Sequence, residues 1–266
     1  MLNPPTKVLL FLPLFFLSSQ ALLHSSSSFD LQFSEWRQLL RTYVKEGRVD
    51  YASLKKSPKL LNAYLHSIAN VSKEEYDRWS RDQKIAFWLN AYNATAIKMV
   101  VDHYPLKKAF GFKALIFPEN SIQQIPGVWD KKVLDVFGAK VSLNQIENEI
   151  LRKEFQDPRI HFALVCASVG CPELREEPYV GDRLDAQFKD QIVRFLADPR
   201  KFRYDASSNT IYLSPIFKWF RKDFERGGGI ISFLGDYLPQ GEAKKISEST
   251  KIQWLSYDWS LNERRS

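Results

Sequence analysis

The run from Arg81 to Val101 constrains the fold more than any other part of the sequence. Between Ile85 and Val101 nearly every residue is apolar, so a helix formed here would be apolar around most of its circumference. Such a helix is stable only when other elements surround it. The tetrapeptide Ser80-Arg81-Asp82-Gln83 has the form of a capping box that would start the helix. We therefore predict a buried core helix at about residues 81–101.

The composition is that of a globular protein with a sizeable core. The chain has 266 residues, of which 44% are hydrophobic and 14% aromatic. Its net charge of +7 comes from 38 Lys and Arg against 31 Asp and Glu, and both signs are spread along the chain. Because no dense basic block is present, we expect no nucleic-acid partner.

The N-terminus has the pattern of an export signal. Lys7 precedes the apolar run Val8–Leu17, and Ser19-Gln20-Ala21 offers small residues for signal peptidase. The run is shorter than the ~20 residues that span a bilayer, although an uncleaved anchor is the alternative. We predict a Sec-type signal peptide at 1–21, a Ser-rich linker at 22–29 and a globular domain at 30–266. The mature protein would be exported to the periplasm or the exterior, without membrane contact.

The remaining patterns mix helices with short strands. Helical spacing of apolar residues recurs at 36–44, 60–69, 142–154, 184–195 and 230–238. Two hairpins are expected, at 132–141 and 201–213. This mixture predicts a helix-rich α+β domain in which the core helix packs on a small mixed or antiparallel sheet.

Two amide side chains interrupt the apolar surface of the core helix. Asn90 and Asn93 are three residues apart and therefore share one face. A buried amide must find partners for its donors and its acceptor. The pair either fixes the backbone of a neighbouring loop or lines a polar pocket and binds a ligand, and the sequence leaves both open.

One carboxylate falls on the apolar face of the helix predicted at 142–154. Leu143, Ile146 and Leu151 define that face, and Glu147 lies among them. A carboxylate there must be hydrogen-bonded, paired with a cation or held protonated. Glu147 is therefore either a structural anchor or part of a site with His161, which follows soon after this helix.

The stretch Arg159–Arg175 holds one of the four histidines and both cysteines. The apolar run Ile160–Cys166 predicts a strand buried on both faces, followed by a tight turn before Cys171. Regular alternation would place His161 and Cys166 on opposite faces of that strand. If the protein is an enzyme, its chemistry is expected here.

The two cysteines allow several interpretations. In an exported protein Cys166 and Cys171 could form a disulfide. Either could instead be a nucleophile activated by His161, with Glu147 orienting the imidazole. A metal site that also uses His103 or Glu147 is a third interpretation, but the spacing fits no common zinc pattern. Two inert thiols are the fourth, and we predict neither a metal nor a cofactor.

Four segments carry a resemblance to a known family. They are FWLNAYNA at Phe87–Ala94, SLNQIENEILR at Ser142–Arg152, HFALVCASVGCPELR at His161–Arg175 and YDWSLN at Tyr257–Asn262. On these segments the chain resembles an exported bacterial member of the uncharacterised DUF547 domain family. The resemblance implies one α+β domain and no particular activity. It includes all six residues discussed above: Asn90, Asn93, Glu147, His161, Cys166 and Cys171.

Two hypotheses of function follow, and whether the protein is an enzyme stays open. The first is a thiol-dependent hydrolase or acyl-transferase that acts on a small molecule or peptide with Cys166 or Cys171, His161 and Glu147. The alternative is a non-catalytic ligand- or protein-binding module with a structural Cys166–Cys171 disulfide. An analogy to papain-like or transglutaminase-like enzymes is weak, because their cysteine precedes the histidine in the chain.

Overall fold

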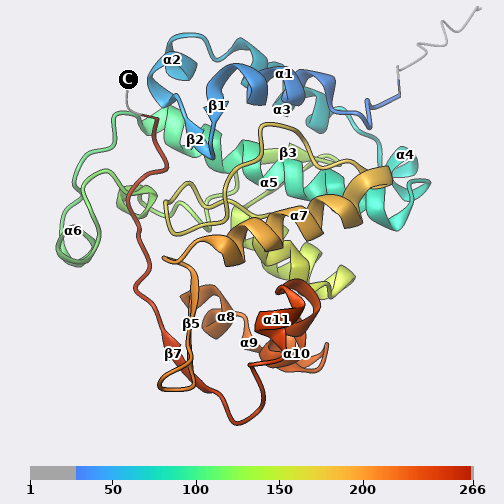
Figure 1. Cartoon of the computed structure of the whole chain (residues 1–266). Coiled ribbons are helices and arrows are strands. Elements are labelled where there is room, and N and C mark those ends of the chain that lie inside the picture. The colour runs from blue at the N-terminus through green and yellow to red at the C-terminus, as the bar shows by residue number, and fades with distance from the viewer. Residues whose placement is uncertain (1–27, 265–266) are drawn as a thin grey trace, which may run out of the picture.

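A computed structural model describes residues 28–264 (Figure 1). The predicted signal peptide and residues 22–27 of the predicted linker lie outside the described residues. No helix in the described part of the chain is long and apolar enough to cross a membrane.

The predicted core helix is confirmed as α5 (Arg81–His103), which runs through the middle of the molecule (Figure 1). Its N-terminus carries the expected capping box. The backbone N–H of Gln83 donates to Ser80 Oγ at 3.2 Å, and the backbone N–H of Ser80 donates to Gln83 Oε1 at 2.8 Å. Ile85 through Ile97 are all buried, as expected of a helix that is apolar on every side.

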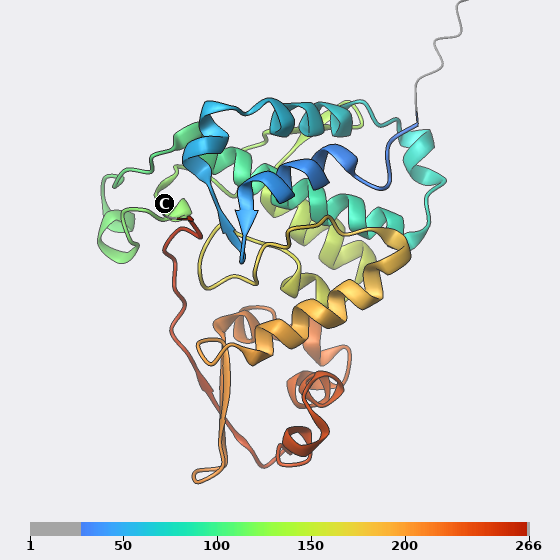
Figure 2. The same ribbon diagram turned by 45° about the horizontal axis from the view of Figure 1, so that its top comes forward.

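Other helices enclose α5. It packs mainly against α2, α3, η2 and the short η4, and α1 covers α3 (Figure 2). The surrounding elements are α1 (Ser34–Tyr43), α2 (Tyr51–Lys56), α3 (Lys59–Ala69), α4 (Lys73–Asp77), the helix η2 (Gln145–Phe155) with π-type turns, and η4 (Gly181–Arg183).

Small antiparallel pairs lie at the edges of this helical part. They are β1 (Val44–Lys45) with β2 (Arg48–Val49), and the predicted hairpin β3 (Leu134–Val136) with β4 (Ala139–Val141). The connection between α5 and β3 contains α6 (Phe112–Ile116) and the 3-10 turn η1 (Ile122–Gln124).

The C-terminal part has its own apolar cluster and the largest sheet. Strands β5 (Phe202–Asp205) and β6 (Thr210–Leu213) form the predicted hairpin, and β7 (Lys251–Trp254) joins β6 in parallel. The helices of this part are α7 (Leu184–Ala197), α8 (Pro215–Trp219), α9 (Arg221–Glu225), α10 (Gly229–Tyr237) and α11 (Gln240–Ala243). The α+β class is confirmed, and α7 is the helix in contact with β5.

The strand predicted at Ile160–Cys166 is wrong. Residues Pro158–Phe162 form the 3-10 helix η3, and the chain after it is irregular. The Asp157 side chain accepts from the Arg159 N–H at 3.0 Å, and Pro158 stands at the first helical position, so the local sequence starts a helical turn. A buried apolar run alone did not distinguish a strand from this arrangement.

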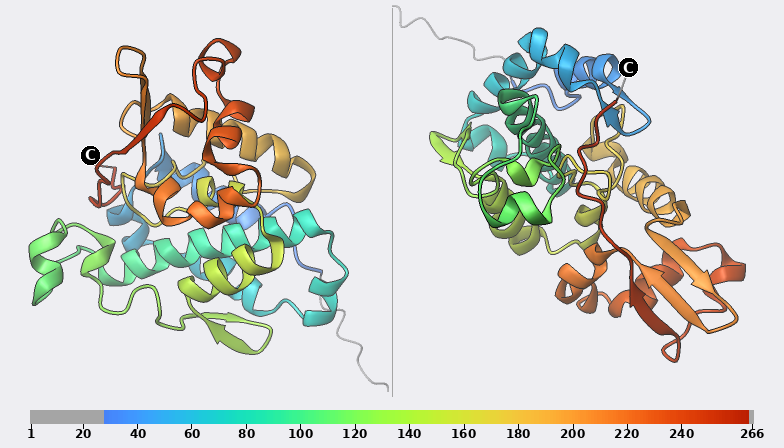
Figure 3. Two further views of the ribbon diagram at one scale, coloured as in Figure 1. Left: turned by 90° about the horizontal axis from the view of Figure 1, so that it is seen from below. Right: turned by 90° about the vertical axis from the view of Figure 1, so that its left-hand side faces the viewer.

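The last residues of the chain return to the helical part. After β7 the segment 255–264 runs past the 167–170 loop to β2 (Figure 3). The Val169 N–H donates to the Ser260 carbonyl and the Gly170 N–H to the Asp258 carbonyl, both at 2.8 Å. The Val49 N–H donates to the Asn262 carbonyl at 2.9 Å. This C-terminal segment, residues 255–264, therefore fixes the loop that carries the cysteines.

Replacing Ser80 with Ala tests the start of the core helix. The change removes the oxygen that accepts from the Gln83 N–H, so we expect the free energy of unfolding to fall by about 1 kcal/mol. Ser80→Asp keeps an acceptor at this position and serves as the control, with an expected change of a few tenths of a kcal/mol. Urea unfolding followed by circular dichroism measures both. Equal losses in the two variants would contradict the capping role.

Candidate functional site

One pocket gathers most of the residues singled out in the sequence. It has a volume of about 210 Å³ and lies where η2, η3, α8 and the C-terminal segment meet. Glu147, His161, Cys166 and Cys171 all line it. A larger pocket of about 440 Å³ near Phe29 contains none of the predicted site residues. The chemistry therefore marks the smaller pocket as the candidate site.

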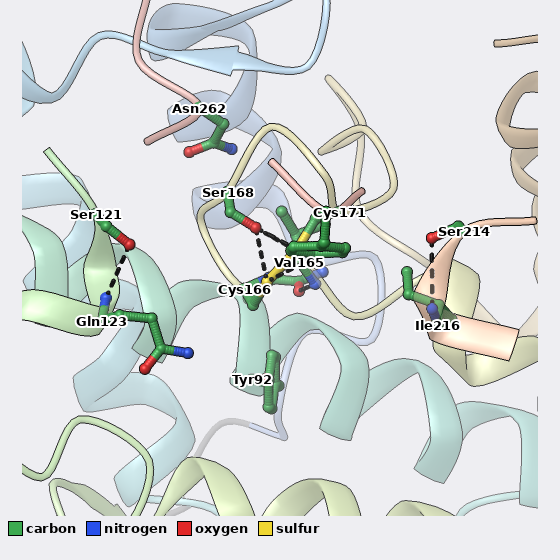
Figure 4. The surroundings of a disulfide bond; sticks show 12 residues. Tyr92, Ser121, Gln123, Val165, Cys166, Ser168, Cys171, Ser214, Ile216 and Asn262 are labelled. Carbon is green, nitrogen blue, oxygen red and sulfur yellow. Dashed lines mark hydrogen bonds between the residues drawn. A yellow bond between two sulfur atoms is a disulfide. The ribbon is translucent and has the colours of Figure 1, made fainter. Parts of the chain in front are cut away.

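Cys166 and Cys171 form a disulfide bond at this pocket (Figure 4). Their Cα atoms are 6.2 Å apart, within the usual range for a disulfide. Cys166 is partly exposed, whereas Cys171 is only 3% exposed. Of the two cysteines, Cys166 is therefore the one more open to a molecule in the pocket.

Hydroxyl groups surround the disulfide. The Tyr257 OH donates to Cys171 Sγ at 3.1 Å and lies 3.2 Å from Cys166 Sγ. Ser168 Oγ lies 3.1 Å from Cys166 Sγ and donates to Cys171 Sγ at 3.4 Å (Figure 4). The backbone N–H of Cys166 donates to Cys171 Sγ at 2.9 Å. The buried sulfur thus has three donors around it.

A glycine permits this contact with Tyr257. A Cβ atom at Gly170 would lie 2.9 Å from three carbons of the Tyr257 ring, which is closer than carbon atoms approach one another. The Tyr257 ring therefore lies directly on the backbone of the loop. This close approach explains why the turn between the cysteines has glycine at position 170.

The partner of His161 is an aspartate that the sequence analysis did not identify. His161 Nε2 lies 2.8 Å from Asp223 Oδ2, and Arg152 Nε donates to the same oxygen at 2.6 Å. The expectation that Glu147 orients the imidazole is therefore wrong. The ring also stacks on Phe220, with centroids 3.8 Å apart and planes 13° apart.

These contacts determine the charge states of the pair. Burial opposes ionisation of Asp223, but hydrogen bonds from His161 and Arg152 hold the pKa of this carboxyl below its usual range. Burial also lowers the pKa of His161, although Asp223 acts against it. At neutral pH the neutral imidazole therefore donates its Nε2 proton to the aspartate. Its Nδ1 is then an acceptor.

The second nitrogen of His161 is an unpaired acceptor beside the pocket within residues 28–264. Nδ1 is buried and has no hydrogen-bond partner within residues 28–264. A buried polar atom without a partner is costly and calls for an explanation. Neither sulfur is hydrogen-bonded to this ring in the described structure. The imidazole and the disulfide are related only in that both line the same pocket.

Glu147 is the second titratable group in the pocket. The Tyr92 OH donates to Glu147 Oε2 at 3.3 Å. Enclosure by apolar neighbours raises the pKa of Glu147 to about 7, against the opposing effects of Arg152 and the Tyr92 hydrogen bond. The prediction that this carboxylate is abnormal is thus supported by its surroundings, and near neutral pH it exists in both protonation states.

Asn90 and Asn93 lie behind the pocket and do not line it. Asn90 bonds both backbone groups of Tyr179, accepting from its N–H at 3.0 Å and donating to its carbonyl at 2.7 Å. Asn93 accepts from the Val165 N–H at 2.8 Å and donates to the Ala163 carbonyl at 3.0 Å. These contacts favour the first interpretation, in which the pair fixes loop backbone. A role in ligand binding stays a prediction.

Aromatic rings complete the wall of the pocket. Trp129, Trp219, Phe220, Tyr257 and Trp259 all line it. Trp219 stacks on Trp259 with ring centroids 5.8 Å apart. No group of three side chains within residues 28–264 is arranged to hold a metal ion. The pocket therefore combines an apolar wall with a disulfide, an imidazole and a carboxyl group.

Several of these residues carry little or no signal in the sequence. Asp223 is 62 positions from His161, and no spacing rule connects the two. Tyr257 had a signal, because it begins the YDWSLN segment of the family resemblance. Ser168 lies inside the stretch Arg159–Arg175, but its small size indicated only a turn.

Comparison with known proteins supports the family resemblance over part of the chain. Residues 76–196 match the family model "Protein of unknown function, DUF547". The matching segment contains α5, Glu147, His161 and both cysteines, whereas Asp223 and Tyr257 lie beyond it. Comparisons with curated proteins and with solved structures gave no match.

Replacing Asn93 with Ala tests the support of the cysteine loop. The change leaves the Val165 N–H and the Ala163 carbonyl without partners in the core, so we expect a loss of about 2–4 kcal/mol in the free energy of unfolding. The control is Asn62→Ala on the exposed side of α3, where the expected change is within about 0.5 kcal/mol. Similar losses for both would mean that the Asn93 contacts contribute little.

Replacing Glu147 with Gln tests the raised pKa. The folded protein holds this proton up to about pH 7, whereas an unfolded chain releases it near 4.5. Native stability therefore falls as the pH rises between these values, since ionisation is less favourable in the fold. The glutamine variant lacks this loss, so we expect it to gain on the order of 2 kcal/mol relative to the native protein on going from pH 4 to pH 8. Urea unfolding at both pH values measures the gain, and parallel pH profiles would contradict it.

Proposed function

We propose that the protein catalyses thiol–disulfide exchange at the pocket. The observation that carries this proposal is the asymmetry of the disulfide. Cys166 is partly exposed in the pocket wall, whereas Cys171 is buried and surrounded by hydrogen-bond donors. Exchange requires one sulfur that can be attacked and another that can leave as a thiolate.

The environment of Cys171 suits a leaving group. When the disulfide opens, Cys171 receives the electron pair of the S–S bond as a thiolate. The Cys166 N–H at 2.9 Å and the Tyr257 OH at 3.1 Å are positioned to donate to this anion. Hydrogen bonds to the charged form of a group favour that form, and a thiol with a lower pKa leaves faster.

The reaction proceeds in two balanced steps. A substrate thiolate attacks Cys166 Sγ, a mixed disulfide forms, and Cys171 leaves as a thiolate. A second thiolate on the substrate then attacks the substrate sulfur of the mixed disulfide, and Cys166 leaves. The substrate dithiol becomes a disulfide, and the two cysteines take up the two protons and two electrons. A disulfide-bearing partner would reoxidise them.

We assign His161 as the base of the first step; because its Nδ1 is buried, neighbouring side chains must move when a thiol enters. An incoming thiol must lose its proton before it attacks, because the thiolate is the nucleophile. Asp223 on Nε2 leaves the lone pair of Nδ1 directed away from the carboxylate, and this nitrogen has no other partner in the described chain. Glu147 shares the pocket and can exchange protons near neutral pH.

The substrate that fits this proposal is a peptide or a small molecule with two thiols. The tryptophan and phenylalanine rings of the wall offer apolar contact to the groups beside a cysteine. The absence of any strongly charged side chain among the lining residues other than Glu147 favours a substrate without a high charge.

The other two hypotheses make different demands on the same site. A thiol-dependent hydrolase needs a free sulfur, so it would have to act after reduction of the disulfide. In a non-catalytic binding module the disulfide would only stabilise the loop. The partly exposed position of Cys166 in the pocket wall favours exchange over a purely structural bond.

An exchange assay with matched variants tests the proposal. The full chain is mixed with a reduced dithiol peptide and glutathione disulfide, and formation of the peptide disulfide is followed. We expect Cys166→Ser to abolish the catalysed rate. Tyr257→Phe should slow it about tenfold, because a donor to the leaving thiolate is lost. Tyr212→Phe, in strand β6, serves as the control and should keep the native rate.

Two results would contradict exchange, and a third would contradict the role of Tyr257 in it. A native protein that does not accelerate peptide oxidation would favour the binding module. Ester hydrolysis that appears only after reduction, and depends on Cys166, would favour the hydrolase. Equal effects of Tyr257→Phe and Tyr212→Phe would remove the role assigned to the buried sulfur's donors.

A further inference from the structure

A cluster of large apolar side chains is exposed at α6 and the turn before it. Phe110 is 103% exposed, Leu115 82%, Phe112 76% and Ile116 53%. Scattered exposed apolar residues are normal on proteins, but four within seven positions of the chain form a patch. We call residues 107–117 the apolar protrusion.

The apolar protrusion extends away from the body of the molecule. Figure 1 shows α6 on a loop at the far left, and Figures 2 and 3 show the same loop projecting from the end of α5. None of the residues of α6 is buried. The folded chain therefore presents these side chains to something other than its own core.

A buried glutamine holds the apolar protrusion in shape. Gln124 is 3% exposed, and its Oε1 accepts from the Ala109 N–H at 3.0 Å. Its Nε2 donates to the carbonyls of Phe117 at 3.0 Å and Pro118 at 3.1 Å. One side chain thus joins the two ends of the loop. The tip of the apolar protrusion is therefore exposed in an ordered loop, whose ends are held by hydrogen bonds.

Gly111 provides the turn at the tip. Its φ of 81° lies in the left-handed region, which favours glycine, and a Cβ there would meet no atom within 4 Å. The glycine is therefore needed for the backbone conformation and not for space.

The charges beside these apolar side chains are mostly positive. Lys107, Lys108 and Lys113 are exposed, and none of them forms an ion pair within residues 28–264. Glu119 is the exposed carboxylate nearest in sequence. Aromatic and aliphatic side chains at a tip, with lysines around them, match the interface of an anionic lipid bilayer.

We propose that the apolar protrusion docks the protein on an anionic lipid surface. Phe110, Phe112 and Leu115 would enter the boundary between headgroups and acyl chains, and the lysines would lie among the lipid phosphates. This is adsorption without a membrane span. It departs from the expectation of no membrane contact in the mature protein.

The base of the apolar protrusion is in contact with the wall of the pocket. Phe117, at the end of the protrusion, packs edge-on against Trp259 with centroids 5.6 Å apart. Trp259 lines the pocket that contains the disulfide. The docking proposal stands on the exposed side chains alone and does not depend on the proposed exchange reaction.

Vesicle sedimentation with three sets of variants tests the proposal. The full chain is mixed with vesicles of phosphatidylcholine alone or with added phosphatidylglycerol. We expect binding to the anionic vesicles to fall about tenfold or more in the triple variant Phe110→Ser, Phe112→Ser, Leu115→Ser, and by a similar factor in Lys107→Gln, Lys108→Gln, Lys113→Gln. The controls are Val193→Ser, which changes an exposed apolar residue of α7, and Lys153→Gln, Lys189→Gln, Lys244→Gln, which removes equal charge elsewhere.

All variants keep the same N-terminal segment, so differences among them report on the protrusion. Hydrogen exchange provides a local measurement that the N-terminus cannot mimic. On adding anionic vesicles we expect slower exchange of the amides of 110–116 and no change in α7. Vesicle binding without protection of 110–116, binding that is equal for neutral and anionic vesicles, or no binding at all would overturn the proposal.

Discussion

The structure of the site depends on how the core helix holds the backbone of the cysteine loop. Asn93 bonds the Ala163 carbonyl and the Val165 N–H, which precede Cys166 directly. The backbone of this stretch has no strand neighbour to pair with, so a side chain takes that place. Asn93 itself is buried on α5, which runs through the middle of the molecule (Figure 1). The backbone just before Cys166 is therefore hydrogen-bonded to the buried core helix.

Three distant parts of the chain then complete the chemistry around this loop. The C-terminal segment brings Tyr257 to both sulfurs, and α9 brings Asp223 to His161. Each contact gives a reactive group a defined state: the hydroxyl faces the buried sulfur, and the carboxylate fixes which imidazole nitrogen carries the proton. The match to the DUF547 family model ends at residue 196, before both of these residues. The segment that matches thus contains the disulfide but not all of its surroundings.

Local patterns in the sequence predicted the elements whose stability is local. The capping box at Ser80, the all-round apolar run of α5 and both hairpins were correct because each depends on neighbouring residues. The strand at Ile160–Cys166 was wrong because the partner of its backbone is Asn93, a side chain 72 positions from Val165. Burial of Glu147 could be inferred from its helix face, whereas the pairing of His161 with Asp223 depends on tertiary structure. The sequence therefore indicated which residues were unusual, but not which of them meet.

The central claim is that the disulfide is opened from the pocket, at Cys166. The most direct measurement is to mix the oxidised protein with glutathione, trap the free thiols by alkylation and locate the adducts by peptide mass spectrometry. The account predicts glutathione on Cys166 and the alkyl group on Cys171, because only Cys166 is accessible and Cys171 leaves as the thiolate. Glutathione on Cys171, or a disulfide that remains closed until the protein is unfolded, would contradict it.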